Sequence, residues 1–147
     1  MEFNLSPIGV VKNGIQGRHR GDHWKAVISD IVIHADLEDA LDAIGGFSHI
    51  IVLCWLHEIS DSERAVMKVH PKGNEELPLV GVLASRSPAR PNPISVTTVK
   101  LLRRDRNVLK VQGLDAVDGT PVLDIKPHIP HYDSPPQATT PDWVAKD

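Results

Sequence analysis

The chain contains 147 residues, of which 41% are hydrophobic and 24% charged, a composition typical of one globular domain with a buried core. Its net charge of −3 argues against nonspecific binding to nucleic acid, and no apolar run approaches the ~20 residues that cross a bilayer, so neither DNA nor a membrane is an expected partner. The single cysteine, Cys54, can form no internal disulfide, which favours a reducing cytoplasm. Its apolar neighbours predict a buried side chain rather than a nucleophile.

Runs of β-branched and other apolar residues recur along the chain between turn-forming residues, and they predict a series of β-strands. The run Phe47–Leu56 is nearly all apolar, which predicts a strand buried on both faces. Turn signals at Arg104–Asn107 and at Asp118–Gly119 predict reversals between the last three strands. The expected strands are Ile8–Val11, Ala26–His34, Phe47–Leu56, Leu79–Leu83, Ile94–Leu102, Val108–Leu114 and Pro121–Ile125.

One short helix is expected from Asp36 to Ile44, because Asp36 can cap its first turn and Gly45–Gly46 can end it. The segment Asn13–Lys25 predicts a long loop, and Ser60–Leu77 predicts an irregular surface excursion. The elements together predict a mainly β fold, either a single-domain β-barrel or a rolled mixed sheet, with one short helix and long surface loops. We expect this domain to cover residues 1–133 and a proline-rich tail to cover 134–147.

The stretch from Ala84 to Ile94 is the most distinctive part of the chain and reads Ala-Ser-Arg-Ser-Pro-Ala-Arg-Pro-Asn-Pro-Ile. Each proline fixes φ, removes an amide donor and restricts the residue before it, so the stretch predicts a stiff, extended loop. Such a loop presents its polar side chains at low entropic cost, which is typical of a ligand site. A proline-rich surface connection without a ligand is the alternative.

Basic residues are concentrated between Arg86 and Lys110, where seven of them face one acid, Asp105. This stripe could meet a polyanion or an anionic group of a cofactor. For Arg103–Arg106 the better interpretation is a solvated turn between two strands.

The histidines and the cysteine match no known metal or nucleophile pattern. His49 and His57 can share one face of a strand, but no third ligand has a recognisable spacing, so no metal site is expected. Cys54 and His57 would lie on opposite faces of the same strand, which argues against a nucleophile pair.

Three acids, Asp115, Asp118 and Asp124, bracket a predicted turn near the end of the strands. A carboxylate there can hold a ribose diol or accept a proton. Asp118 is explained by the turn itself, so Asp115 and Asp124 are the better functional candidates.

Two long motifs, Arg86–Ile94 and Gly113–Pro127, resemble the TsaA-like (TrmO) family, as do Pro7-Ile-Gly-Val, Phe47-Ser-His and Trp55-x-His. The resemblance covers residues 6 to 133. It implies a β-barrel that binds S-adenosyl-L-methionine, forms a homodimer and acts as a methyltransferase. The characterised activity of the family is N6-methylation of threonylcarbamoyladenosine at tRNA position 37.

The resemblance also implies which residues form the cofactor site. Their chemistry is suitable, because S-adenosylmethionine offers a carboxylate to arginine, a ribose diol to carboxylates and an adenine edge to backbone groups. The implied cofactor-binding residues are Arg18, His19, Arg20, His57, Glu58, Arg86, Ser87, Val96, Gln112, Gly113, Leu114 and Asp115.

For catalysis, we expect Asp124 to accept the proton of the methylated nitrogen, with Asn92 and Lys126 positioning the substrate. Ser95 and His128 depart from the glycine and tyrosine usual in the family. Net charge −3 and 4% aromatic residues give little support for RNA binding, so a small-molecule methyltransferase stays an alternative. A noncatalytic S-adenosylmethionine-binding module is another.

Overall fold

The computed structural model describes residues 1–17 and 22–144. The chain forms two compact units. The first comprises Met1–His57 and Ile94–His128 and contains a β-barrel, and the second comprises Glu58–Pro93 and the segment from Ile129 onwards and contains the proline-rich loop. Within the described residues, no helix is both long and apolar enough to span a bilayer.

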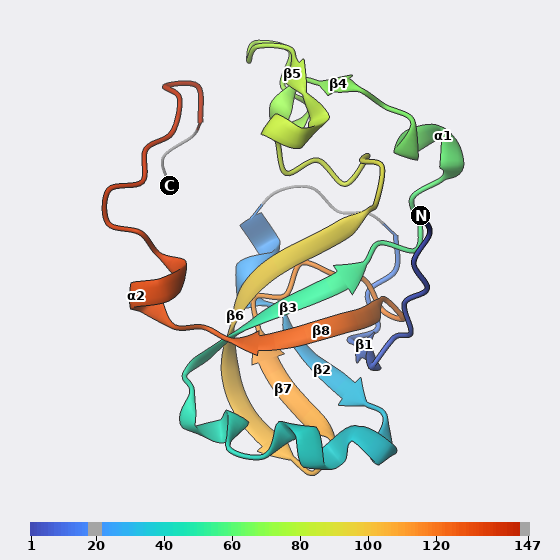
Figure 1. Ribbon diagram of the computed structural model, residues 1–147, viewed down its shortest axis with the longest axis vertical. Coiled ribbons are helices and arrows are strands. Elements are labelled where there is room, and N and C mark those ends of the chain that lie inside the picture. Colours follow the sequence, from blue (N-terminus) through green and yellow to red (C-terminus); the bar gives the residue numbers. More distant parts are fainter. Residues whose placement is uncertain (18–21, 145–147) are drawn as a thin grey trace. The chain divides into compact units, whose positions relative to one another are not determined.

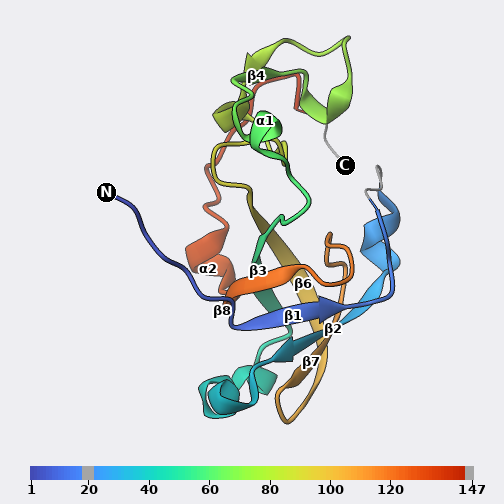
Figure 2. The same ribbon diagram turned by 90° about the vertical axis from the view of Figure 1, so that its right-hand side faces the viewer.

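Six antiparallel strands close the barrel in the order β1-β2-β7-β6-β3-β8. Figure 1 shows β6, β3 and β8 side by side, and Figure 2 shows β1 between β2 and β8, where the barrel closes. Closure pairs both edges of the sheet, which removes open strand edges from the barrel. The mainly β, barrel-type fold predicted from the sequence is therefore confirmed. The strands are β1 (Gly9–Lys12), β2 (Ile28–Ile33), β3 (His49–Trp55), β6 (Ile94–Asp105), β7 (Val108–Gln112) and β8 (Pro121–Pro127).

The core of the barrel consists of the alternate residues that point inward from each strand. In β3, Ile50, Val52 and Cys54 are fully buried, whereas the residues between them are only partly buried. This alternation corrects the sequence prediction of a strand buried on both faces, because the outer face of β3 is apolar without being enclosed. The other strands contribute Val11, Ile31, Ile33, Val99, Leu101, Leu109, Val111 and Val122 to the same core.

Two short 3-10 helices, Ala35–Leu41 and Ile44–Gly46, connect β2 to β3. Leu41 is buried in the barrel core, and Leu37 and Ile44 pack against it. These three residues attach both 3-10 helices to the barrel core.

The predicted single helix Asp36–Ile44 is wrong in its start and its end. The segment is 3-10 rather than α-helical, and the residue before its first turn is His34, which makes no side-chain cap. The first 3-10 helix ends at Leu41, and Ala43 follows in the left-handed region with φ of 71°. A segment this short recovers little of the cost of nucleating an α-helix, so tertiary packing of its leucines decides its shape.

The β6–β7 hairpin is tighter than the sequence predicted. Asp105 pairs directly with Val108, so only Arg106 and Asn107 form the turn, and Arg106 adopts a φ of 53°. Further along β6, the register shifts between Leu101 and Arg103. The shift leaves Leu102 as an extra residue, which is a β-bulge.

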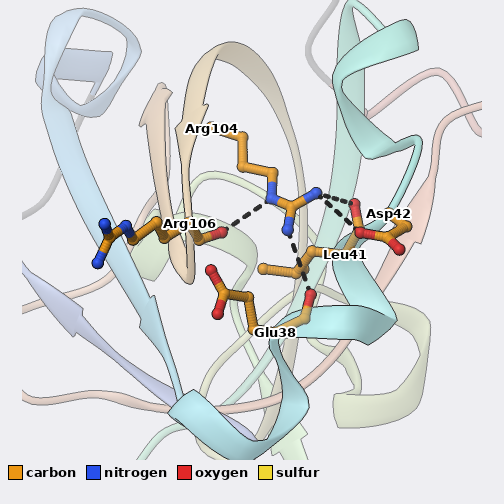
Figure 3. Close-up of polar contacts among 5 residues, drawn as sticks. All are labelled: Glu38, Leu41, Asp42, Arg104 and Arg106. Atoms are coloured by element: carbon orange, nitrogen blue, oxygen red, sulfur yellow. Dashed lines mark hydrogen bonds and ion pairs between the residues drawn. The ribbon is translucent and has the colours of Figure 1, made fainter.

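Arg104 ties this hairpin to the first 3-10 helix, as Figure 3 shows. Its guanidinium donates to the carbonyl oxygens of Arg106 (2.8 Å), Leu41 (3.1 Å) and Glu38 (3.3 Å). It also lies 3.4 Å from Oδ1 of Asp42. The expectation of a merely solvated turn at Arg103–Arg106 is therefore wrong for Arg104, because unpaired carbonyls beside it attract its donors.

The second unit contains only short elements. The predicted strand Leu79–Leu83 is too long, because only Val80–Gly81 forms a strand and Val82–Ala84 turns as a 3-10 helix. Leu79 and Leu83 are exposed, so this strand lacks the packing that would extend it. The elements are α1 (Asp61–Arg64), β4 (Lys68–Val69), a 3-10 turn at Pro71–Gly73, β5 (Val80–Gly81), a 3-10 turn at Val82–Ala84 and α2 (Pro130–Asp133).

The segments predicted as loops also contain regular turns. A 3-10 helix at Asp22–Ala26 begins within the predicted loop Asn13–Lys25 and ends one residue beyond it. Within the predicted irregular stretch, α1 begins with a capping box, in which Ser60 and Glu63 satisfy each other's backbone amides.

Candidate functional site

The proline-rich loop in the second unit is held by its own serines. Oγ of Ser85 donates to the Val82 carbonyl (2.8 Å) and accepts from the Ser87 amide (3.2 Å). Oγ of Ser87 in turn accepts from the Ala89 amide (3.2 Å). Serine hydroxyls that bond nearby backbone in this way fix turns. Ser87, predicted to bind the cofactor, thus already supports the shape of the loop.

Arginines complete this internal network. Nη1 of Arg90 donates to the carbonyls of Ser85 (3.2 Å) and Ser87 (3.1 Å). Nε of Arg64, the last residue of α1, donates to the Pro91 carbonyl at 2.7 Å. The loop is therefore fixed both by its own arginine and by a neighbouring helix.

Arg64 is a residue of this site that the sequence analysis missed. The motif Ser60-x-x-Glu63 signals a helix start and would have indicated that Arg64 ends a helical turn. Nothing in the sequence pattern indicates its contact with Pro91, 27 residues further on.

Arg86 is the exposed cation of the loop. Its side chain has no hydrogen-bond or ion-pair partner among the described residues, unlike that of Arg90. Asn92, predicted to position the substrate, is also exposed in this loop. Glu58 lies in the same unit and has an interaction of its own.

On the barrel, three predicted site residues share the outer face of β6, β3 and β8. Cross-strand neighbours of an antiparallel sheet point to the same side, with Cβ atoms about 5 Å apart. In this register, Leu53 of β3 lies between Val96 of β6 and Asp124 of β8. In the next row, Ile51 of β3 lies beside Lys126 of β8. The two rows are Val96–Leu53–Asp124 and Thr98–Ile51–Lys126.

Asp124 and Lys126 form an ion pair on that face. Nζ of Lys126 lies 2.9 Å from Oδ2 of Asp124, and the two side chains are 61% and 47% exposed, respectively. Oδ1 of Asp124 accepts from the Ile125 amide at 2.9 Å. The hydrogen bond to Asp124, with the charge of its carboxylate, raises the pKa of Lys126. Asp124 thus presents an accessible carboxylate whose orientation is fixed by Lys126 and the Ile125 amide.

The segment after β7 carries four more predicted cofactor residues. Gln112 is the last residue of β7. Gly113 turns the chain with a φ of 95°, and its amide donates to the carbonyl oxygen of Val27. Leu114 is fully buried in the core, so only its backbone can contact a ligand. Partial burial raises the pKa of Asp115, and the nearby charge of His23 opposes that rise.

Asp118 builds the turn, as the sequence indicated. Its Oδ1 accepts from the amides of Asn13 (2.8 Å) and Gly14 (3.1 Å). These hydrogen bonds, with Asn13 contributing most, lower the pKa of Asp118. Gly119 follows with φ of 81°.

Cys54 points into the core and is fully buried. Burial raises its pKa to about 12, so the thiol is protonated at neutral pH. The interpretation of Cys54 as a buried apolar residue is confirmed.

Four predicted cofactor-binding residues remain, of which only His57 lies in the described part of the chain. His57 is exposed just beyond β3 in the barrel unit. Arg18, His19 and Arg20 lie outside the described residues. In the described part of the chain, no three His, Cys, Asp or Glu side chains form a group that could hold a metal ion.

The structure thus brings Val96, Asp124 and Lys126 together on the barrel wall. It also groups Arg86, Ser87 and Asn92 within one stiff loop of the second unit.

Comparison with known proteins assigns most of the chain to one family. Residues 15–134 match the model of the tRNA-methyltransferase O N-terminal domain. A "Probable S-adenosyl-L-methionine-binding protein" of Methanothermobacter thermautotrophicus is 41% identical over 137 residues, which cover 91% of this chain and 96% of that protein.

Two longer relatives carry the methyltransferase name. The "tRNA (adenine(37)-N6)-methyltransferase" of Escherichia coli is 38% identical, with 93% of this chain and 62% of that protein covered. The crystal structure of TrmO from Pseudomonas aeruginosa matches with a TM-score of 0.75 and 26% identity, covering 99% of this chain and 64% of that one. The chain therefore spans less than two thirds of these two proteins.

The resemblance noted in the sequence is thereby confirmed, and the cofactor expectation agrees with the names of the archaeal relatives. The chain belongs to the family of the tRNA-methyltransferase O N-terminal domain.

Proposed function

We propose that this protein binds S-adenosylmethionine and transfers its methyl group to N6 of threonylcarbamoyladenosine at position 37 of tRNA. The observation that carries the proposal is the family match over residues 15–134, extended to nearly the full length of a relative named for S-adenosylmethionine binding. The name of the Escherichia coli relative, which specifies N6 of adenine 37 of tRNA, supports this methyl acceptor.

Two of the predicted cofactor-binding side chains have chemistry that suits S-adenosylmethionine. An exposed guanidinium on a stiff loop, Arg86, matches the carboxylate of the methionine part, because arginine forms bidentate bonds with carboxylates. Asp115, on a glycine turn, can accept from a ribose diol. When bound, S-adenosylmethionine supplies a methyl group activated by its sulfonium.

The acceptor nitrogen is attached to a urea-type group and is a poor nucleophile, so it must lose its proton as it is methylated. Asp124 is our candidate for the proton acceptor. The carboxylate is accessible, and its two oxygens are oriented by Lys126 and by the Ile125 amide. Lys126 and Asn92 are candidates for orienting the acceptor, since alignment is the main requirement of a displacement reaction.

Transfer of a labelled methyl group to tRNA tests the acceptor. Wild-type protein should label tRNA that carries the threonylcarbamoyl group and leave tRNA without that group unlabelled. Labelling of a metabolite extract, with neither tRNA labelled, would reject the tRNA acceptor in favour of a small molecule.

The role of Asp124 is tested by Asp124→Asn in the same assay. A lost general base costs about a hundredfold or more in rate, and calorimetric binding of S-adenosylmethionine should be unchanged. Asp36→Asn, at an exposed carboxylate on a 3-10 helix, removes the same charge and should label at the wild-type rate. A wild-type rate for Asp124→Asn would exclude it as the base.

A second candidate function is a noncatalytic S-adenosylmethionine-binding module. It is favoured by coverage: the chain spans 96% of a relative named only for cofactor binding, but 62% of the named methyltransferase. Cofactor binding without label in any acceptor would support this candidate.

A homodimer is a further part of the proposal. Phe3 and Leu5, which are 80% and 64% exposed, leave apolar surface in the barrel unit that association could cover. Light scattering in solution should give twice the mass of the chain, and the mass of one chain would contradict the dimer.

A further inference from the structure

The barrel carries a row of charges on its outer face, on the wall formed by β1, β2, β7 and β6. Lys12 pairs with Asp30, Asp30 with Lys110, and Lys110 with Arg103. Direct cross-strand neighbours point to the same side of a sheet. The four side chains therefore run across four adjacent strands.

The β-bulge at Leu102 lets Lys100 share this face with Arg103. Lys100 pairs with Gln112 in the next row, and both point outward with the exposed Ile28. In a regular strand, Lys100 and Arg103 would point to opposite faces, because their separation is odd. The extra residue in the bulge turns both outward.

Most of these cations are not used by the fold. Lys110 pairs with Asp30 at 3.1 Å. Lys100 and Arg103 have no hydrogen-bond or ion-pair partner among the described residues, in contrast to Arg104. At the turn, the Arg106 side chain points away from the cluster around Arg104 (Figure 3). The register places four cations on the wall (Lys12, Lys100, Arg103 and Lys110) against two acids (Asp30 and Asp105).

A shallow hollow of about 180 Å³ lies on this wall. It is too small for S-adenosylmethionine, since sites for ligands of that size have volumes of about 300 Å³ or more. Its lining combines cations with carboxylates, which suits a group that carries both an anion and hydroxyl donors. The lining residues are Asp30, Arg103, Asp105, Val108 and Lys110.

A ribose-phosphate unit has this combination of groups, and RNA repeats it along its backbone. Lysine and arginine bind phosphates without regard to sequence, and a carboxylate can accept from the 2′-hydroxyl that DNA lacks. We propose that the outer wall of β2, β7 and β6 binds the sugar-phosphate backbone of RNA, with Arg103 and Lys100 on phosphates and Asp105 on a 2′-hydroxyl. The assignment rests on the proposed function, which makes tRNA the substrate.

The double variant Lys100→Gln/Arg103→Gln tests the phosphate contacts. Binding of fluorescent tRNA is measured by anisotropy across a salt series, with thermal melts to establish that each variant is folded. Loss of two phosphate contacts should weaken binding about tenfold and reduce the slope of log affinity against log salt by about 1.5. Unchanged affinity would overturn the proposal.

A matched control separates a local surface from net charge. Lys68→Gln/Lys72→Gln removes two exposed lysines from the second unit and changes the net charge equally. We expect wild-type tRNA binding in this control. Equal weakening in both double variants would mean that net charge alone acts, which would overturn the surface.

Failure of this surface can be told apart from failure of the proposed methylation. Both double variants should bind S-adenosylmethionine with wild-type affinity. If wild-type protein methylates tRNA but Lys100→Gln/Arg103→Gln binds it normally, only the surface is rejected. If tRNA binding depends on the surface but no methyl group is transferred, the surface stands and the methylation is rejected.

Asp105→Ala tests the contact to the 2′-hydroxyl, because it should change the affinity for RNA and the affinity for DNA in opposite directions. Removal of a negative charge alone should strengthen binding of both an RNA stem-loop and its DNA counterpart. Loss of a contact to the 2′-hydroxyl should instead weaken RNA binding about threefold while DNA binding strengthens. Equal strengthening of both would overturn the role of Asp105 and the preference for RNA.

Discussion

The proline-rich loop contains two arginines and the β6–β7 hairpin contains three, and in each region neighbouring arginines have different environments. In the loop, Arg90 donates to two carbonyls, whereas Arg86 is exposed and has no acceptor among the described residues. In the hairpin, Arg104 donates to three carbonyls, whereas Arg103 points outward with none.

The difference shows that irregular backbone decides which arginine remains available for a ligand. Carbonyl oxygens in short 3-10 helices and proline-rich turns lack the backbone amide donors of regular structure, so a nearby guanidinium can donate to several of them at once. The arginine that is not used in this way, Arg86 or Arg103, can bind an anion. A count of basic residues in the sequence does not separate the two kinds.

The largest effect on stability should come from Arg104→Ala. The variant removes charge-assisted hydrogen bonds between the hairpin and the helix that covers Leu41, so the free energy of unfolding should fall by about 2 kcal/mol. Urea-induced unfolding measures the loss. Arg104→Lys should recover little of it, because an ammonium cannot reach several carbonyls in a fork. A loss below about 0.5 kcal/mol would show that the contacts are incidental.

Arg90→Ala should loosen the loop without unfolding the barrel. Two weaker hydrogen bonds are lost, so the amides of Ser87 and Ala89 should exchange with solvent about fivefold faster, which corresponds to about 1 kcal/mol. Hydrogen exchange resolved by residue provides the measurement. Arg86→Ala is the control, and equal acceleration there would contradict the distinction between the two arginines.

Asp118 is an acid whose side chain is engaged by the fold, as Arg90 and Arg104 are. The backbone amides of Asn13 and Gly14 donate to its carboxylate. The amides hold its pKa below the unfolded value of about 3.9, so its contribution to stability is present above that pH and is lost as pH falls through the folded pKa. Thermal melts of wild type and Asp118→Ala should therefore differ at pH 7 and converge below about pH 4. A difference that persists at pH 2 would assign the effect to packing instead.

Arg103→Ala should have the smallest effect on stability. Its side chain has no partner among the described residues, so the free energy of unfolding should stay within about 0.5 kcal/mol of wild type. A larger loss in urea-induced unfolding would mean that Arg103 resembles Arg104.

The barrel was predictable because its strands follow local rules. The apolar run Phe47–Leu56 contains a real strand, and the signal Asp118–Gly119 marks a real turn. Arg86 and Asp124 were proposed from motifs, and their accessibility fits those roles.

Features that depend on contacts distant in sequence were not predictable. The 3-10 geometry of Ala35–Leu41 depends on packing into the barrel, and the Arg64–Pro91 contact joins residues far apart in the chain. The bulge at Leu102 depends on the register between two strands, which no local pattern of β6 encodes.

Calorimetric titration with S-adenosylmethionine tests the central claim most directly, using wild type, Arg86→Ala and Arg103→Ala. We predict that wild type and Arg103→Ala bind equally, and that Arg86→Ala binds about tenfold to a hundredfold more weakly, the effect of a lost charge-assisted hydrogen bond. Wild-type affinity in Arg86→Ala, or no binding by wild type, would contradict the account.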